Sequence, residues 1–319
     1  MTASAIRDRL QVAEPVAAAL AEGRPVVALE STLISHGLPY PQNLEVARAS
    51  AGAIRESGAE PATVAIHDGL ILVGLSDEDL VALATARPGS VVKASRPSLV
   101  AALDRAGWAA TTVSATMIAA HAAGIEVFAT GGIGGVHRGA LGTTASGLPP
   151  TLDISSDLEE LARTPVGVVC AGPKAILDVA PTLEYLETRG VPVVTIGQDE
   201  LPGFYARSSG LESPSSVSDA EAAAQRVGAQ LGLGLGGGIL VCVPVPEADA
   251  LPDDVARAAT ERATRDAESA GITGPELTPW LLARVAELTD GASIRANVAL
   301  IVNNARVAGL LASTLAGAG

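Results

Sequence analysis

Two lysines are the residues of this chain best suited to covalent chemistry. Of its 21 basic residues only Lys93 and Lys174 are lysines, and all the others are arginines. Arginine keeps its proton in proteins, whereas a desolvated lysine can lose it and form an imine with a carbonyl carbon. A covalent amine catalyst is therefore one interpretation. The other is a drift of the composition toward arginine that spared two positions.

Lys174 stands where a strand is expected to pass into a helix. Residues 166–172 form an apolar run typical of a strand, and Pro173 is typical of the first turn of a helix. The positive end of a helix dipole disfavours an ammonium ion and so favours the neutral amine. Lys93 ends a second short apolar run, residues 91–93, just before another predicted helix, so both lysines occupy equivalent places.

Three carboxylates follow or precede predicted elements. Glu30 ends the apolar strand predicted over residues 24–30, where partial burial would favour the protonated acid and suit it to donate a proton. A solvated residue at a strand end is the alternative. Asp153 and Asp157 flank two serines before a predicted helix. They either complement the helix dipole or hold Mg²⁺ or Mn²⁺, which bind through one or two carboxylates and several retained waters.

A glycine-rich loop over residues 131–139 follows a predicted strand, residues 125–130. Its backbone N–H groups could line an anion site or let a substrate approach closely, and a plain turn is the alternative. His137 in this loop is a better ligand candidate than His121, which lies on an alanine-rich helix face. Residues 232–237 match the dinucleotide fingerprint, but they follow a helix and precede a strand, so we predict a turn there.

Strands and helices alternate along most of the chain. Further strands are predicted over residues 191–197 and 238–246, with a hairpin at 62–74. Helices are predicted over residues 4–22, 41–57, 112–124, 216–231, 251–270, 279–288 and 293–315. This alternation predicts an α/β fold with a largely parallel sheet covered on both faces. We interpret residues 1–319 as a single α/β domain with a helical C-terminal portion, about 251–315.

Ligands of such folds bind beyond the carboxyl ends of the strands. Glu30, Lys93, the glycine-rich loop and Lys174 are all predicted to lie at that edge. The sequence therefore predicts that one site unites them.

The composition of the chain limits the classes of molecule that it is expected to bind. With 35 acidic and 21 basic residues the net charge is −14, which repels nucleic-acid polymers and anionic membranes. Cys170 and Cys242 lie in apolar runs and are expected in the core. Charges within residues 1–22 argue against a signal peptide, and no apolar run approaches the length of a membrane span, so we expect a cytoplasmic protein that binds a small molecule.

Six stretches together resemble the pseudouridine-5'-phosphate glycosidase family, also called the indigoidine synthase A-like family. They run in order between about Pro25 and Gly309 and comprise residues 29–39, 67–69, 130–139, 153–157, 170–178 and 278–282. The resemblance implies a three-layer α/β/α fold, a homotrimer and a divalent metal ion, usually Mn²⁺ with Mg²⁺ as the alternative. It also implies reversible cleavage of a nucleoside monophosphate, pseudouridine 5'-phosphate, to uracil and ribose 5-phosphate.

The resemblance also implies roles for individual residues. Lys174 matches the Schiff-base lysine, Glu30 the proton donor and Asp153 the metal ligand. The substrate-binding positions are Lys93, Val113, His137, Ser155, Ser156, Asp157 and Asn297. Residues 141–150 form a longer link than is usual in the family.

The implied reaction explains the need for a lysine. A C–C glycosidic bond cannot be broken by protonating an oxygen or nitrogen leaving group, so the two carboxylates of ordinary glycosidases are insufficient. Glu30 would protonate the ring oxygen, Lys174 would add to C1', and Lys93 would hold the phosphate. One alternative is an imine-forming aldolase or lyase acting on another sugar phosphate, and a further one is a non-catalytic sugar-phosphate sensor.

Overall fold

Short runs of valine, leucine and alanine form the central strands of the computed structural model, which describes residues 3–142, 150–272 and 277–317. β2 (Val26–Leu29), β9 (Gly167–Cys170) and β13 (Ile239–Cys242) are buried at every position. Strands of this composition occur where both faces of a sheet are covered. The apolar runs therefore predict the middle of the sheet correctly.

The described residues form one sheet of eleven strands and a separate ribbon of two. Every strand pair of the large sheet is parallel except β3–β4 and β3–β6, so the expected largely parallel sheet is confirmed. Its order is β1 (Leu10–Val12), β4 (Leu70–Val73), β3 (Glu60–His67), β2, β7 (Val127–Ala129), β9, β13, β11 (Val193–Ile196) and β12 (Ser216–Val217), while β6 (Trp108–Thr111) pairs with β3 and with β5 (Val92–Ala94). The ribbon joins β8 (Val136–His137) to β10 (Leu177–Asp178).

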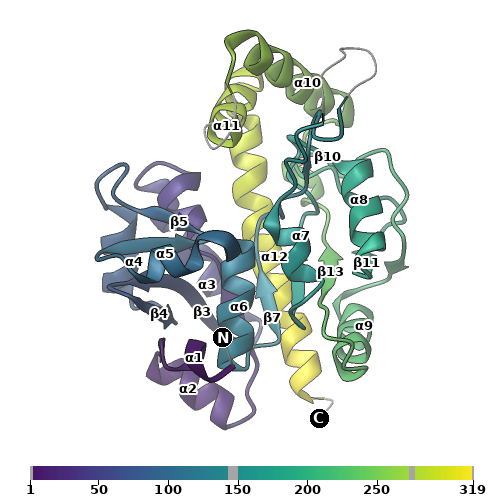
Figure 1. The fold of residues 1–319 in the computed structure, drawn as a ribbon. Helices are drawn as coiled ribbons and strands as arrows, with labels where there is room; N and C mark the ends of the chain where they lie inside the picture. The colour runs from purple at the N-terminus through teal and green to yellow at the C-terminus, as the bar shows by residue number, and fades with distance from the viewer. Residues whose placement is uncertain (1–2, 143–149, 273–276, 318–319) are drawn as a thin grey trace.

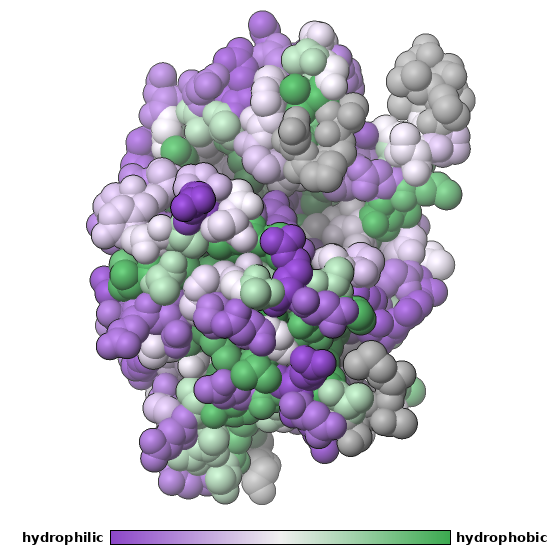
Figure 2. Space-filling view, turned by 60° about the vertical axis from the view of Figure 1, so that its left-hand side comes forward, coloured by the Kyte–Doolittle hydropathy of each residue, from purple (hydrophilic) through white to green (hydrophobic). Residues whose placement is uncertain are grey.

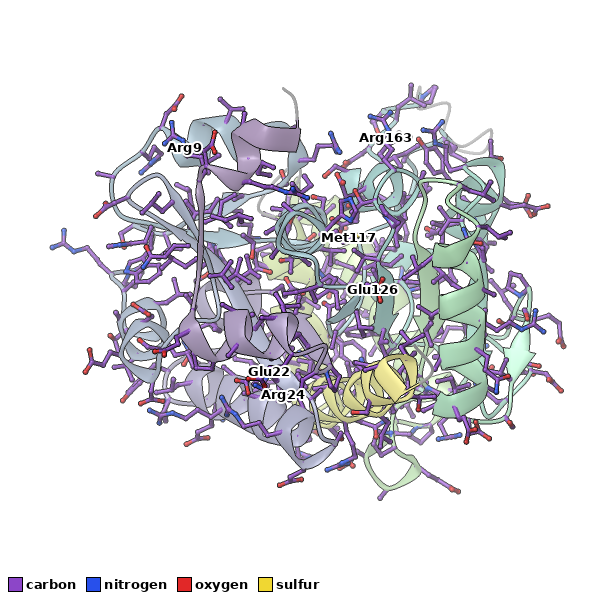
Figure 3. The ribbon with its side chains drawn as sticks, turned by 90° about the horizontal axis from the view of Figure 1, so that it is seen from below. Arg9, Glu22, Arg24, Met117, Glu126 and Arg163 are labelled. Atoms are coloured by element: carbon purple, nitrogen blue, oxygen red, sulfur yellow. The ribbon has the colours of Figure 1, made fainter. Side chains whose placement is uncertain are left out.

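Helices cover the sheet on both faces (Figure 1). On one face, α6 (Val113–Ala123), α7 (Ser156–Leu161) and α8 (Val179–Thr188) bury Met117, Leu158 and Leu186 against the strands. On the other, α3 (Gln42–Glu56), α9 (Ala220–Gly232) and α12 (Ala292–Gly317) bury Ile54 and Leu311. Figure 3 shows Met117 inside the molecule, with Arg9 and Arg163 at its edge. The three-layer arrangement is therefore confirmed.

The remaining helices lie at the ends of these layers. They are α1 (Ala3–Arg7), α2 (Glu14–Ala21), α4 (Asp77–Ala84), α5 (Leu99–Leu103), α10 (Asp253–Ala270) and α11 (Leu277–Leu288). α10 and α11 pack against the N-terminal half of α12 at the top of Figure 1. These three helices correspond to the expected helical C-terminal portion, and the single domain stays a prediction.

α12 corrects one expectation from the sequence. Within the described residues it is the one helix long and apolar enough to span a membrane by length and composition. Leu300, Ala305 and Leu311 are nevertheless fully buried against the sheet and α3. Hydrophilic residues cover most of the face seen in Figure 2, and apolar residues form smaller patches between them. We interpret α12 as a core helix of an α/β fold.

Two helix predictions are partly wrong for the same physical reason. The helix predicted over residues 4–22 is split, because Leu10–Val12 pairs with β4 as an edge strand. The helix predicted over residues 216–231 begins only at Ala220, because Ser216–Val217 pairs with β11. Pairing with a distant strand overrides local periodicity in both places. β6, the strand Trp108–Thr111, is absent from the sequence prediction.

Cys170 and Cys242 are core residues, as predicted. Both are fully buried free thiols, and they lie side by side on the parallel strands β9 and β13. The hydrogen bond with Cys170 raises the pKa of the Cys242 thiol, and burial raises it further. A buried thiol with a raised pKa behaves as a small apolar residue.

Candidate active site

A cavity of about 690 Å³ lies beyond the carboxyl ends of β2, β7 and β9. These strands are parallel neighbours, so the residues that follow them meet at one edge of the sheet. All the site residues predicted from the sequence line this cavity: Glu30, Lys93, Val113, His137, Asp153, Ser155, Ser156, Asp157, Lys174 and Asn297. The structure thus brings them together, while their individual roles stay predictions.

The local structure around Lys174 differs from the predicted helix start. Lys174 lies in a turn between β9 and β10, and α8 begins only at Val179. Its backbone N–H donates to the carbonyl of Ile133 at 3.1 Å, and its carbonyl accepts from Leu177 at 2.9 Å. The prediction of a helix at Pro173 is wrong, because Leu177–Asp178 pairs with β8 of the glycine-rich loop instead. A helix dipole therefore does not act on Lys174.

The second lysine supplies an electrostatic effect that the sequence could not reveal. Lys93 stays exposed to the cavity, yet its pKa lies below the usual lysine value. Desolvation lowers this pKa most, the ammonium of Lys174 lowers it further, and the carboxylate of Glu30 opposes both. Lys93 therefore lies within electrostatic range of both Lys174 and Glu30, and the two amines repel each other when both are protonated.

Glu30 is the first residue after β2, and both of its carboxylate oxygens accept hydrogen bonds. Thr32 donates its hydroxyl to Oε2, and Thr130 donates its hydroxyl to Oε1. Thr130 follows β7, the parallel neighbour of β2, and its side chain is almost fully buried. The two threonines therefore fix the orientation of the Glu30 carboxylate at the cavity wall.

Asp157 lines the cavity and joins three elements through its carboxylate. Oδ1 accepts from the backbone N–H of Ser114 in α6 at 3.0 Å, and Oδ2 accepts from that of Gly134 at 2.9 Å. The side chain is only 6% exposed. A Cβ on Gly134 would lie 2.2 Å from the Ser155 Oγ, so only glycine fits there. α6, α7 and the glycine-rich loop thus meet at this carboxylate.

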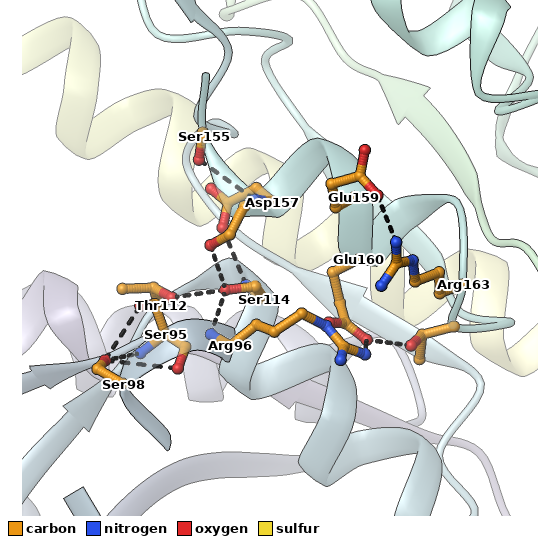
Figure 4. Close-up of polar contacts among 12 residues, drawn as sticks. Ser95, Arg96, Ser98, Thr112, Ser114, Ser155, Asp157, Glu159, Glu160 and Arg163 are labelled. Carbon is orange, nitrogen blue, oxygen red and sulfur yellow. Dashed lines mark hydrogen bonds and ion pairs between the residues drawn. The ribbon is translucent and has the colours of Figure 1, made fainter. Parts of the chain in front are cut away.

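A polar network supports these helix ends from outside the cavity (Figure 4). Glu160 is fully buried and accepts from the Arg96 Nη2 at 3.0 Å, from the Arg96 Nε and from the Thr164 hydroxyl. The backbone N–H of Arg96 donates to the Ser114 Oγ at 3.1 Å. A buried carboxylate needs a positively charged partner, and Arg96 is that partner for Glu160. Through its backbone hydrogen bond to Ser114, Arg96 also connects Glu160 to the start of α6.

The residues near Asp153 fit a hydrated divalent cation. Its exposed carboxylate lies 3.9 Å from the His137 Nδ1, and the two backbones are joined by a hydrogen bond of 3.0 Å. The described ranges contain no cluster of three histidine, cysteine or acidic side chains that could hold a metal. A single carboxylate with retained waters suits Mg²⁺ or Mn²⁺, whereas a zinc site needs more protein ligands.

Several residues of the site are missing from the sequence prediction. Thr32, Thr130 and His36 line the cavity, and Asn304 lies behind it. His36 belongs to a single π-helical turn, Leu33–Gly37, and desolvation and then Lys93 lower the pKa of its imidazole. A lowered pKa favours the neutral form of this ring, although His36 is exposed to the cavity. These residue types are too common for their identity alone to mark a site.

Comparison with known proteins gives one family throughout. A family model described as indigoidine synthase A like protein matches residues 15–314. Over 300 residues the chain is 52% identical to a protein of Roseobacter denitrificans named pseudouridine-5'-phosphate glycosidase, covering 94% of each. A protein of Methylobacterium nodulans with the same name is 53% identical over 309 residues, covering 97% of this chain and 89% of that relative.

A solved structure is similar over nearly the whole chain. It is the crystal structure of the prealnumycin C-glycosynthase AlnA in complex with ribulose 5-phosphate, with a TM-score of 0.86 and 37% identity. The similarity covers 97% of both chains. This neighbour therefore shares the fold of the chain, and its crystal structure contains a sugar phosphate.

Proposed function

Since the chain belongs to the indigoidine synthase A-like family, as its motifs predicted, we propose that it is a pseudouridine-5'-phosphate glycosidase. It cleaves pseudouridine 5'-phosphate reversibly to uracil and ribose 5-phosphate. The observation that carries this function is the cavity that Lys174, Lys93 and Glu30 line together, with Lys93 within electrostatic range of the other two. Breaking the C–C bond leaves C1' electron-poor, and an amine bonded to C1' can supply a lone pair to it once a proton donor has opened the sugar ring.

Lys174 is the proposed nucleophile. Glu30 protonates the ring oxygen as the bond from that oxygen to C1' breaks, and the Lys174 amine forms a bond to C1'. Protonation at uracil C5 then lets the C5–C1' bond break, its electron pair restoring the C5–C6 double bond of the base. The nitrogen lone pair closes an imine on C1', and water hydrolyses it to ribose 5-phosphate and the free amine.

The phosphate is proposed to bind where positive potential gathers. Lys93 offers a point charge, and the backbone N–H of Val113 at the start of α6 has no partner within the helix, whereas that of Ser114 already donates to Asp157. Ser155 and Ser156 add hydroxyls at the same wall. These groups support binding of an anion in a protein whose net charge is strongly negative.

Asp153 is the proposed ligand of the divalent cation, through retained waters and with His137 beside it. A cation held by Asp153 would add positive potential to the cavity. The protein is further proposed to be a cytoplasmic homotrimer, as the resemblance implies. Light scattering would test the trimer, and a monomeric mass would contradict it.

Two assays test the function and its mechanism. With pseudouridine 5'-phosphate and Mn²⁺ the protein should release uracil and ribose 5-phosphate, and the absence of uracil would refute the proposal. An aldolase acting on another sugar phosphate would release no base. Borohydride should trap ribose 5-phosphate on the native protein and on Lys93→Arg, but not on Lys174→Arg, because a guanidinium forms no imine. An adduct that persists in Lys174→Arg would exclude that lysine as the nucleophile.

A further inference from the structure

Asn304 is a fully buried polar side chain in the middle of α12. Its Nδ2 donates to the carbonyl of Thr130 at 2.9 Å and to that of Gly131 at 3.3 Å. Its Oδ1 is also buried and has no hydrogen-bond partner among the described residues. The orientation of the amide is nevertheless fixed, because the flipped form would turn Oδ1 toward two carbonyl oxygens.

The Asn304 amide has opposing effects on stability. Its own Oδ1 is a buried acceptor without a partner among the described residues, which costs free energy, whereas its Nδ2 supplies a donor to the carbonyl of Thr130. The neighbours of Asn304 on the buried side of α12 include Leu300, Ala308 and Leu311, which form part of the cores. A leucine would match these apolar neighbours but would leave the carbonyl of Thr130 without this donor, so the amide is explained by the segment that it holds.

The amide holds the segment that orients Glu30. Thr130 receives the Asn304 hydrogen bond at its carbonyl and donates its own hydroxyl to Glu30 Oε1. Gly131 leaves no free space beside α12, since a Cβ there would lie 3.0 Å from Ile301 Cγ1. α12 is thus packed directly against this segment. The hydrogen bond from Asn304 fixes the position along α12 at which Thr130 lies.

We propose that Asn304 is a positioning residue that sets Glu30 for proton transfer through Thr130. This inference rests on the proposed function, because Glu30 acts as the proton donor there. Asn304 does not touch the cavity and is distinct from Asn297, which lines it on the same helix. Its effect on the reaction therefore passes through the threonine hydroxyl.

The test compares Asn304→Leu with Asn303→Leu, a matched change at a half-buried neighbour that makes no side-chain hydrogen bond to described residues. In Asn304→Leu we expect kcat for uracil release to fall about 10- to 100-fold, since small misplacements of catalytic groups have effects of this size. KM for pseudouridine 5'-phosphate should stay near the native value, whereas the thermal midpoint should fall because the Thr130 carbonyl loses its donor, so kcat is measured well below the midpoint of the variant. Asn303→Leu should leave kcat unchanged.

A double-mutant cycle shows whether the effect passes through Thr130. If it does, Asn304→Leu combined with Thr130→Val is no slower than Thr130→Val alone. Effects that multiply, or a kcat of Asn304→Leu within twofold of native, would overturn the inference. If Asn304→Leu fails to fold, Asn304→Ala takes its place with the same expected results.

Crystal structures separate this inference from the proposed function. If the native protein releases no uracil, the glycosidase function is refuted. The contact between Thr130 and Glu30 can still be tested, because it is read from crystal structures and not from activity. We expect this contact in the native structure and its loss in Asn304→Leu. A contact that persists in the variant would overturn the positioning role, whatever the activity.

Discussion

At the scale of single residues, the two lysines differ in their environment and in their proposed roles. Lys174 is half-buried in a turn between two strands, where a neutral amine can reach a sugar carbon. Lys93 is exposed to the cavity, and it must be protonated to bind the phosphate in its proposed role. The ammonium of Lys174 lowers the pKa of Lys93, whereas a bound phosphate would favour the protonated form of Lys93.

The lowered pKa of Lys93 predicts a specific pH dependence of binding. Phosphate needs the ammonium form, and as the pH rises Lys93 of the free protein loses its proton below the usual lysine value. KM for pseudouridine 5'-phosphate should therefore begin to rise at a lower pH than an ordinary lysine would require. Lys93→Arg should remove this rise, because arginine stays protonated. The measurement is KM across the alkaline range, and identical profiles of native and variant would contradict the phosphate role.

At the scale of elements, apolar runs predict the strands that position the site, and nonlocal pairing decides the rest. β2, β7, β9 and β13 are continuous apolar runs, so the sequence identifies them and the residues that follow them. The turn at Lys174 depends on the pairing of β10 with the distant β8, which leaves no local signal. The contacts of Asn304 cannot be predicted from the sequence for the same reason, since the two carbonyl groups that it binds lie 173 and 174 positions away.

The contact of α6, α7 and the glycine-rich loop at Asp157 predicts a loss of stability. In Asp157→Asn the amide keeps one acceptor, and its NH₂ faces a backbone N–H, so a buried donor is left without a partner. We expect the free energy of unfolding to fall by about 2–3 kcal/mol, as for lost hydrogen bonds to buried charged groups. KM should also rise, because Val113 moves with α6.

Urea unfolding of Asp157→Asn measures this loss. Asp104→Asn is the matched control, because Asp104 is exposed and makes no side-chain hydrogen bond with the described residues. Its stability should stay within about 0.5 kcal/mol of native. Equal midpoints for the two variants would show that the Asp157 carboxylate does not hold the three elements together.

At the scale of the whole molecule, α12 connects the active site with the opposite end of the fold. Asn297 and Ile301 line the cavity, Asn304 holds the segment behind it, and Gly309 lies against α3 farther along the same helix. Figure 1 shows α12 running through the length of the molecule to the C-terminus. The packing of its C-terminal half therefore sets the position of its site-bearing half.

Two glycine-to-alanine changes in helices that pack together test this coupling, and they should act in opposite directions. In Gly309→Ala the new methyl would lie 2.7 Å from Ser57 Cβ and 3.3 Å from Ile54 Cα, so α12 and α3 must separate. Overpacking of this kind costs about 1–3 kcal/mol of stability, and the shift of α12 should also lower kcat. In Gly52→Ala of α3 the methyl meets no atom within 4 Å, so helix propensity should raise stability by about 0.5–1 kcal/mol without changing kcat. Thermal unfolding and uracil release measure both effects, and a Gly309→Ala protein as stable as Gly52→Ala would show that the contact between α12 and α3 is loose.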